Sequence, residues 1–158
     1  MSHVVKWSVI LTVLVAIVSI AFIAAGMHTN PITNLLFIPV AIVINVVVIV
    51  LALRATAGEQ GYKLQLRDGF LIGVFAGVLI TATSWITLSF VFPDAIAEMT
   101  AGAEELIRGS GLDDELVEAQ VRALEGVTPF SQAWPGGLGT LFWSILTSAI
   151  GGIFIRRK

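Results

Sequence analysis

The stretch DGFLIGVFAGVLITATSWITLSFVF, residues 68–92, decides the fold, because no charged side chain follows Asp68 until Asp94. A helix needs about 20 predominantly apolar residues to cross a hydrocarbon core of about 30 Å. The uncharged run meets that length. It therefore predicts a membrane-spanning helix, which we place at Phe70–Phe92.

Three further stretches have the same apolar character, namely Trp7–Ala25, Pro31–Leu53 and Leu138–Ile155, and none contains an ionisable side chain. The first follows a lysine, as a signal peptide would. Its apolar run is longer than the roughly 7–15 residues of a signal-peptide core, so we expect a retained helix. The chain, residues 1–158, is thus predicted to be a single all-α membrane domain, a bundle of four spanning helices.

The composition supports this class. Hydrophobic residues make up 56% of the chain and charged residues 13%, whereas globular domains average about 45–50% and 25%. The net charge is −2 without any long basic run, so we expect no nucleic-acid partner. The absence of cysteine excludes disulfides and thiolate metal sites.

The basic residues predict the orientation of the spans, because Lys and Arg near span ends resist translocation. Most of them fall before the first span, between the second and third, or after the fourth. The segment between the third and fourth spans, 93–135, carries most of the carboxylates but only Arg108 and Arg122. Both termini are therefore predicted to be cytoplasmic and the acidic segment to be external. The basic residues on the cytoplasmic side are Lys6, Arg54, Lys63, Arg67, Arg156, Arg157 and Lys158.

The acidic segment 93–135 is too long for a tight link between two helices, which usually takes about 2–8 residues. Apolar residues recur in it at helical spacing in two runs, separated by Gly109 and Gly111, with Asp94 and Asp113 as candidate N-caps. It predicts an amphipathic helical hairpin. Its acidity indicates either a solvated face or a patch for a cation or a partner. The acidic residues lack the ligand spacing of a helix–loop–helix calcium site.

Small residues mark one face of each of the last two spans. Gly69, Gly73 and Gly77 recur every four residues in the third, and Ser144, Ser148 and Gly152 do so in the fourth. Small residues let helices approach closely in lipid, where the hydrophobic effect does not drive their association. We expect these two faces to pair within one chain. Homodimerisation through the glycine face is the next alternative, and a glycine-lined pore the last.

Uncharged polar side chains lie inside the second and third spans. An unpaired amide is costly in lipid, so we expect Asn45 to bond to another helix, as packing rather than as a substrate contact. Pro39 removes the hydrogen bond to the carbonyl of Leu35 and should kink the second span. The hydroxyls of the third span bond to their own helix or face a polar cleft. They belong to Thr81, Thr83, Ser84, Thr87 and Ser89.

No catalytic, cofactor-binding or metal-ligating set can be assigned from the sequence. It contains no HExxH, GxSxG or GxxxxGK[ST] motif, and its histidines, His3 and His28, fall on opposite sides of the predicted membrane. Ionisable residues within spans usually mark proton and ion pathways, and the four spans hold none. We therefore expect neither an enzyme nor a proton-coupled transporter.

The order of these features resembles a bacterial membrane-protein family catalogued as domain-of-unknown-function family 4199. The residues that carry the resemblance, over most of the chain, are the link GYKLQLRDGFLIGV (61–74), FPDAIAEM (92–99), GLDDELVEAQ (111–120) and the closing IRRK. The resemblance implies two hydrophobic hairpins, a charged helical segment between the last two spans, and a bacterial membrane location. It implies no activity.

These observations predict an integral protein of a bacterial cytoplasmic membrane that serves a structural or interaction role. The expected partners are the lipid bilayer and a second copy or another membrane protein. The packing motifs and the missing chemistry support this interpretation. A small channel or transporter component is the alternative, because of Asn45, the kinked second span and the hydroxyl-rich third span.

Overall fold

A computed structural model describes residues 2–155, and the regular secondary structure of this part is entirely helical. Four helical segments are long and apolar enough to cross a membrane, which confirms the all-helical class and the four predicted spanning helices. The basic residues 156–158 lie outside the described part. The elements are α1 (His3–Ala24), α2 (Pro31–Leu35), α3 (Phe37–Ala55), α4 (Tyr62–Ile86), the π-helical turn η1 (Thr87–Val91), α5 (Ala95–Arg108), α6 (Asp114–Leu124) and α7 (Pro129–Ile155).

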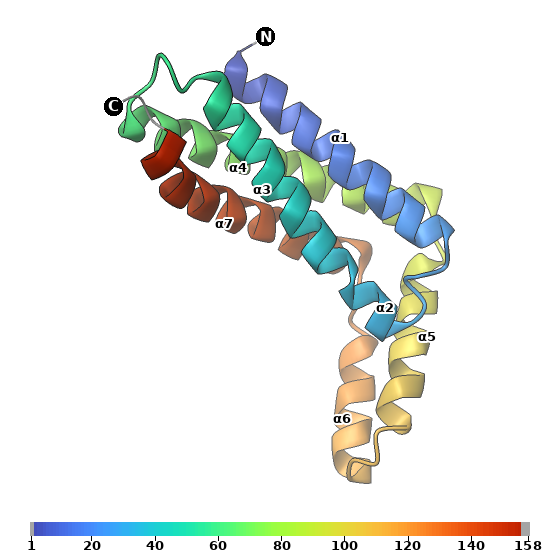
Figure 1. Cartoon of the computed structure of the whole chain (residues 1–158). Helices are drawn as coiled ribbons and strands as arrows, with labels where there is room; N and C mark the ends of the chain where they lie inside the picture. Colours follow the sequence, from blue (N-terminus) through green and yellow to red (C-terminus); the bar gives the residue numbers. More distant parts are fainter. Residues whose placement is uncertain (1, 156–158) are drawn as a thin grey trace.

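The long helices α1, α3, α4 and α7 run side by side, and α5 and α6 project together from one end (Figure 1). The most extensive contact joins α4 to α7, followed by the contacts of α1 with α4 and of α3 with α7. Helix α1 begins and α7 ends at the end of the bundle opposite α5 and α6 (Figure 1). The described chain therefore crosses the length of the bundle four times.

The second span is interrupted, as Pro39 predicts. Helix α2 ends at Leu35 and α3 starts at Phe37, so the break falls at the carbonyl that Pro39 cannot engage. At the start of α2, the side chain of Asn30 accepts a hydrogen bond from the Ile32 amide at 2.9 Å. Asn30 thus acts as an ordinary N-cap, with Pro31 in the first turn.

Two of the long helices begin well before the predicted spans that they contain. Helix α7 begins at Pro129 rather than at Leu138, because Thr128 and Ser131 cap it reciprocally. Each of their side-chain hydroxyls accepts a hydrogen bond from the other's backbone N–H, at 2.8 and 3.1 Å. Pro135, expected to open the span, instead lies inside the helix. Helix α4 begins at Tyr62 rather than near Phe70, and its first turns are packed into the bundle.

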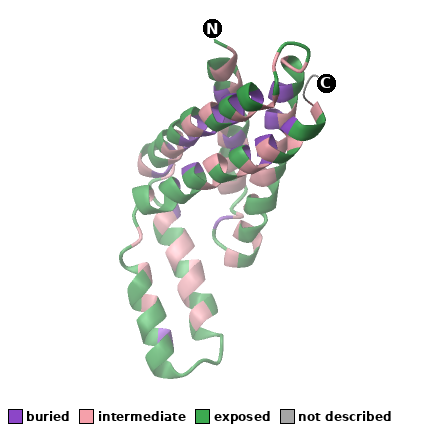
Figure 2. Cartoon of the chain, turned by 90° about the vertical axis from the view of Figure 1, so that its left-hand side faces the viewer, coloured by how far each residue is buried: buried purple, intermediate pink, exposed green. Residues whose placement is uncertain are grey.

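The core of the bundle consists of two clusters of buried apolar residues from α1, α3 and α4, one around Leu11 and Ala76 and the other around Ile49 and Ile72. Buried positions gather between the helices, whereas the outer faces are exposed (Figure 2). Large apolar side chains also occupy these outer faces. Val78, for example, is 65% exposed. A soluble monomer rarely exposes so much apolar surface, so this pattern fits a bilayer.

Helices α5 and α6 form an antiparallel pair that is tethered to the bundle at its base. Arg108 bridges the pair by bonding to Glu104 and Glu118. The hydrogen bond that Arg108 donates to Glu104 and the negative charge of Glu104 raise the pKa of Arg108, and Glu118 adds to the shift. Gly111, with φ +71°, turns the chain between the two helices in a conformation that glycine adopts readily. At the base, Gly102 lies against the Thr29 carbonyl too closely for a side chain to fit.

Candidate functional site

The contact of α4 with α7 is a seam of small residues. A Cβ added at Gly77 would lie 2.8 Å from the carbonyl oxygen of Gly137, and one at Gly73 would lie 2.8 Å from the Cβ of Ser144. At Gly69 an added Cβ would collide with the side chain of Ser148. All three predicted glycines of α4 thus face α7, two of them against the predicted serines.

The sixth predicted packing residue, Gly152, also faces α4, beyond Gly69 toward the start of that helix. An added Cβ there would lie 3.2 Å from the Tyr62 ring, at the first turn of α4. The seam also includes Gly137, which lies one residue before the predicted start of the fourth span. The signal was present, since Gly137, Ser144 and Ser148 fall on one helical face at spacings of seven and four.

Asn45 joins α3 to this seam. Its Nδ2 donates hydrogen bonds to the Ser144 hydroxyl at 3.1 Å and to the Thr140 carbonyl at 3.2 Å. The side chain is buried, and its Oδ1 has no hydrogen-bond partner. The amide thus reaches another helix, as expected of a polar group within a span.

The hydroxyls of α4 differ in their surroundings. Thr81 donates to the Gly77 carbonyl at 2.9 Å, and Thr83 donates to the Leu79 carbonyl at 2.8 Å, so both bond to their own helix. Thr87 is buried at the start of η1, where its carbonyl accepts from the Phe92 amide. Ser84 is half-buried and lines a hollow within the bundle.

The bundle buries two polar side chains of α4 that the sequence analysis placed outside the third span. Gln65 is fully buried, and Asp68 is 4% exposed. Asp68 accepts a hydrogen bond from Gln60 Nε2 at 3.0 Å and pairs with the exposed Arg67 at 3.2 Å. This carboxylate precedes the predicted span Phe70–Phe92, yet it is packed inside the bundle. Asp68 follows Gln65 by three residues and precedes Ile72 by four, so the three side chains share one helical face. That spacing is the sequence signal that predicts the burial of Asp68.

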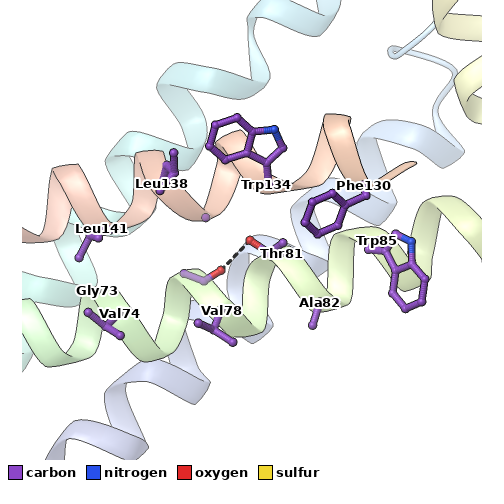
Figure 3. A pocket seen from close by; sticks show the side chains of 12 residues that line it. Gly73, Val74, Val78, Thr81, Ala82, Trp85, Phe130, Trp134, Leu138 and Leu141 are labelled. Carbon is purple, nitrogen blue, oxygen red and sulfur yellow. Dashed lines mark hydrogen bonds between the residues drawn. The ribbon is translucent and has the colours of Figure 1, made fainter. Parts of the chain in front are cut away.

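A groove of about 500 Å³ runs along the outer side of the seam. Thr81 points across it and bonds back to Gly77 (Figure 3). None of the described residues that line the groove is ionisable, and its apolar walls can hold an apolar helix or a lipid chain. Its lining residues are Val74, Val78, Ala82 and Trp85 from α4 and Phe130, Trp134, Leu138 and Leu141 from α7, together with the glycines of the seam (Figure 3).

A second ionisable group is buried at the opposite end from Asp68. His28, in the link between α1 and α2, is 6% exposed, and its Nε2 lies 2.6 Å from the Glu98 carboxylate of α5. The pair ties the base of α5 to the bundle. Within residues 2–155, no three His, Cys, Asp or Glu side chains are grouped in a way that could hold a metal ion.

The four long apolar helices and the uncharged seam between them define a multi-pass α-helical membrane protein. Within this class, the chain belongs to the family described as "Protein of unknown function (DUF4199)", whose model matches residues 6–157. The resemblance seen in the sequence is thereby confirmed. Neither a curated protein nor a solved structure matches the chain.

Replacing Gly137 by alanine tests the seam. The new methyl group would meet the backbone of Gly77 at 2.6 Å, and backbone cannot move aside as a flexible side chain can. We expect Gly137→Ala to lower the free energy of unfolding by about 1–3 kcal/mol. Gly139→Ala is the matched control, because a Cβ at Gly139 meets nothing within 4 Å. Unfolding in mixed micelles measures the stability of both variants. Equal stabilities would contradict a close contact of α4 with α7 at Gly137.

Replacing Asn45 by valine tests the polar link between α3 and α7. Interhelical hydrogen bonds in membranes contribute about 0.6 kcal/mol on average and up to about 1.7 kcal/mol. We expect Asn45→Val to lower stability within that range in the same unfolding measurement. Thr83→Val, which removes bonds only within one helix, should change it by less than about 0.5 kcal/mol. If Asn45→Val left the free energy of unfolding unchanged, the amide would not hold the helices together.

Proposed function

We propose that this protein is a membrane-anchored interaction protein, in which the four-helix bundle is the anchor and the α5–α6 pair is the docking element. We further propose that it lies in the cytoplasmic membrane of a bacterium, with both termini cytoplasmic and α5–α6 external. The charge distribution supports this orientation, because the basic residues outside the α5–α6 segment all fall on one side of the four spans.

The observation that carries the proposal is the exposed apolar surface of the projecting pair. Leu106, Leu112 and Leu116 are each between 44% and 51% exposed. They lie on or beside helices whose polar residues are mainly carboxylates. An apolar centre with a charged rim is the usual composition of a protein interface. A partner with an apolar patch and a basic rim would complement it.

The architecture of the anchor supports the same function. The seam holds α4 against α7 by backbone contact, and α5 is tied to the bundle through Gly102 and the His28–Glu98 pair. The projecting pair is therefore presented in a defined direction. Because α7 covers the glycine face, a second copy or a membrane partner would have to use the groove beside the seam, around Trp85 and Trp134.

A small channel or transporter component is the second candidate. It is favoured by Asn45, which lines a hollow of about 600 Å³ between α3 and α7 and carries an unpartnered oxygen. The hollow is otherwise mostly apolar, which is more typical of a lipid-facing groove than of a water-filled path. Solute flux into proteoliposomes that contain this chain alone would favour the second candidate over the first.

Cysteine labelling tests the orientation, since the natural chain has no cysteine. Both Ser110, between α5 and α6, and Gly58, between α3 and α4, are exposed. We expect Ser110→Cys to react with a membrane-impermeant maleimide in intact cells and Gly58→Cys to react only after permeabilisation. The reverse pattern would place α5–α6 inside the cell and overturn the proposed orientation.

Site-specific crosslinking tests the docking element. A photoreactive amino acid at Leu116 should give an adduct with a second protein in native membranes, and the same residue at Glu59, an exposed position at the other end of the bundle, should not. Leu112→Glu in the same chain should reduce the adduct at least about fivefold, because it adds charge to the apolar centre. Recovery of uncrosslinked monomer alone would contradict the proposal, and an adduct of twice the mass would identify a second copy as the partner.

A further inference from the structure

Three hollows meet at the end of the bundle beneath α5 and α6. The largest, of about 600 Å³, is the groove between α3 and α7. The second, of about 150 Å³, lies further inside the bundle, and the third, of about 210 Å³, lies against α5. Asn34 of α2 and Gln132 of α7 line all three. The hollows therefore share one polar junction.

His28 adds a buried and unsatisfied polar atom to this junction. It lines the second and third hollows, and its Nδ1 has no hydrogen-bond partner. In the tautomer in which Nε2 donates to the Glu98 carboxylate, Nδ1 is a hydrogen-bond acceptor. The side-chain amides of Asn34, which is half-buried, and of Gln132, which is exposed, line the same hollows and add hydrogen-bonding groups at their edge. A buried polar atom without a partner is costly, which favours a ligand that supplies one.

The rest of the large groove is apolar and open toward the bilayer side of the bundle. Leu35 and Ile38 on its wall are 61% and 53% exposed, and Trp143 faces them from α7. The groove continues to Asn45, near the middle of α3. It therefore runs from a polar junction at the end of the bundle toward the centre of the span. A lipid in one leaflet has the same order, with its head at the interface and its chain inside.

Charge restricts the head group. His28 is the one ionisable side chain among the described residues that line the three hollows. A phosphate or an ammonium group would therefore be buried without a counter-ion, which is strongly unfavourable. An anionic head would also meet the negative field of the α5–α6 segment. An uncharged head with hydroxyl or carbonyl groups meets neither penalty.

We propose that this junction and groove bind an uncharged amphiphile. Its hydroxyl or carbonyl head lies among His28, Asn34 and Gln132, and its hydrocarbon chain lies in the α3–α7 groove. A hydroxyl of the head donates to His28 Nδ1, and the two amides bond to its oxygens. The combined hollows fall within the usual range of small-molecule sites, about 300–1,000 Å³.

Photolabelling in nanodiscs tests the site. Two probes carry the same diazirine-bearing chains, one with the uncharged head of a diacylglycerol and the other with the anionic head of a phosphatidic acid. We expect the diacylglycerol probe to label α7 saturably and at least about tenfold more efficiently than the phosphatidic acid probe. The double variant Asn34→Leu/Gln132→Leu should lose about tenfold of this labelling, since two hydrogen bonds are removed.

A second variant tests the chain-binding part independently. Gly139 lines the groove with open space at its Cβ position, so Gly139→Phe should fill the groove and reduce saturable labelling by a similar factor. Gly58→Phe, at an equally open position away from the site, is the matched control. Circular dichroism and size-exclusion profiles verify that each variant is folded. Equal labelling by the two probes, or labelling that none of the site variants reduces, would show contact with bulk lipid only and would overturn the proposal.

Discussion

Backbone contact between α4 and α7 is the constraint on which the rest of the bundle depends. At Gly77 and Gly137 each helix fills the space that a side chain of the other would need. In lipid the hydrophobic effect does not drive helices together, so close packing and interhelical hydrogen bonds must do so. Ser144 contributes to both, because it faces Gly73 and accepts the hydrogen bond of Asn45. Displacing α7 would therefore also remove the hydrogen bonds that Asn45 of α3 donates to it.

Helix α4, which contacts α7, also holds α1. Its Ser8 hydroxyl lies 3.4 Å from the Ile72 carbonyl of α4, while it also bonds within α1 to Val4 at 2.9 Å. Helix α4 thus presents small residues to α7 on one side and Ile72 to α1 and α3 on the other. It is the central helix of the bundle, and among residues 2–155 every polar contact between spans involves α4 or α7. The projecting pair depends on this arrangement, since α5 follows α4 and α6 precedes α7.

Hydropathy was sufficient to predict four spans, because each requires only a long apolar run. The ends of α4 and α7 depend on local contacts that hydropathy does not register. Thr128 and Ser131 start α7 through two hydrogen bonds, and so extend it well before the apolar run. Likewise, Asp68 is charged and lies before the predicted third span. A hydrogen bond from Gln60 and the packing of α4 nevertheless hold it inside the bundle. The glycine spacing predicted which face of α4 is packed, but it could not reveal hollows, which depend on the shapes of several helices together.

The distribution of buried polar groups limits the chemistry of the bundle. Ionisable side chains are buried at its two ends, Asp68 near the start of α4 and His28 beneath α5. Between them, the buried polar residues of the described chain are amides and hydroxyls, such as Asn45 and Ser144. Proton pathways through membranes are usually built from chains of titratable groups. Amides and hydroxyls already bonded between helices instead stabilise packing, whereas the amides of Asn34 and Gln132 lie at the half-buried and exposed edge of the hollows, where a bound molecule can reach them. This distribution of polar groups supports the anchoring and recognition role proposed above.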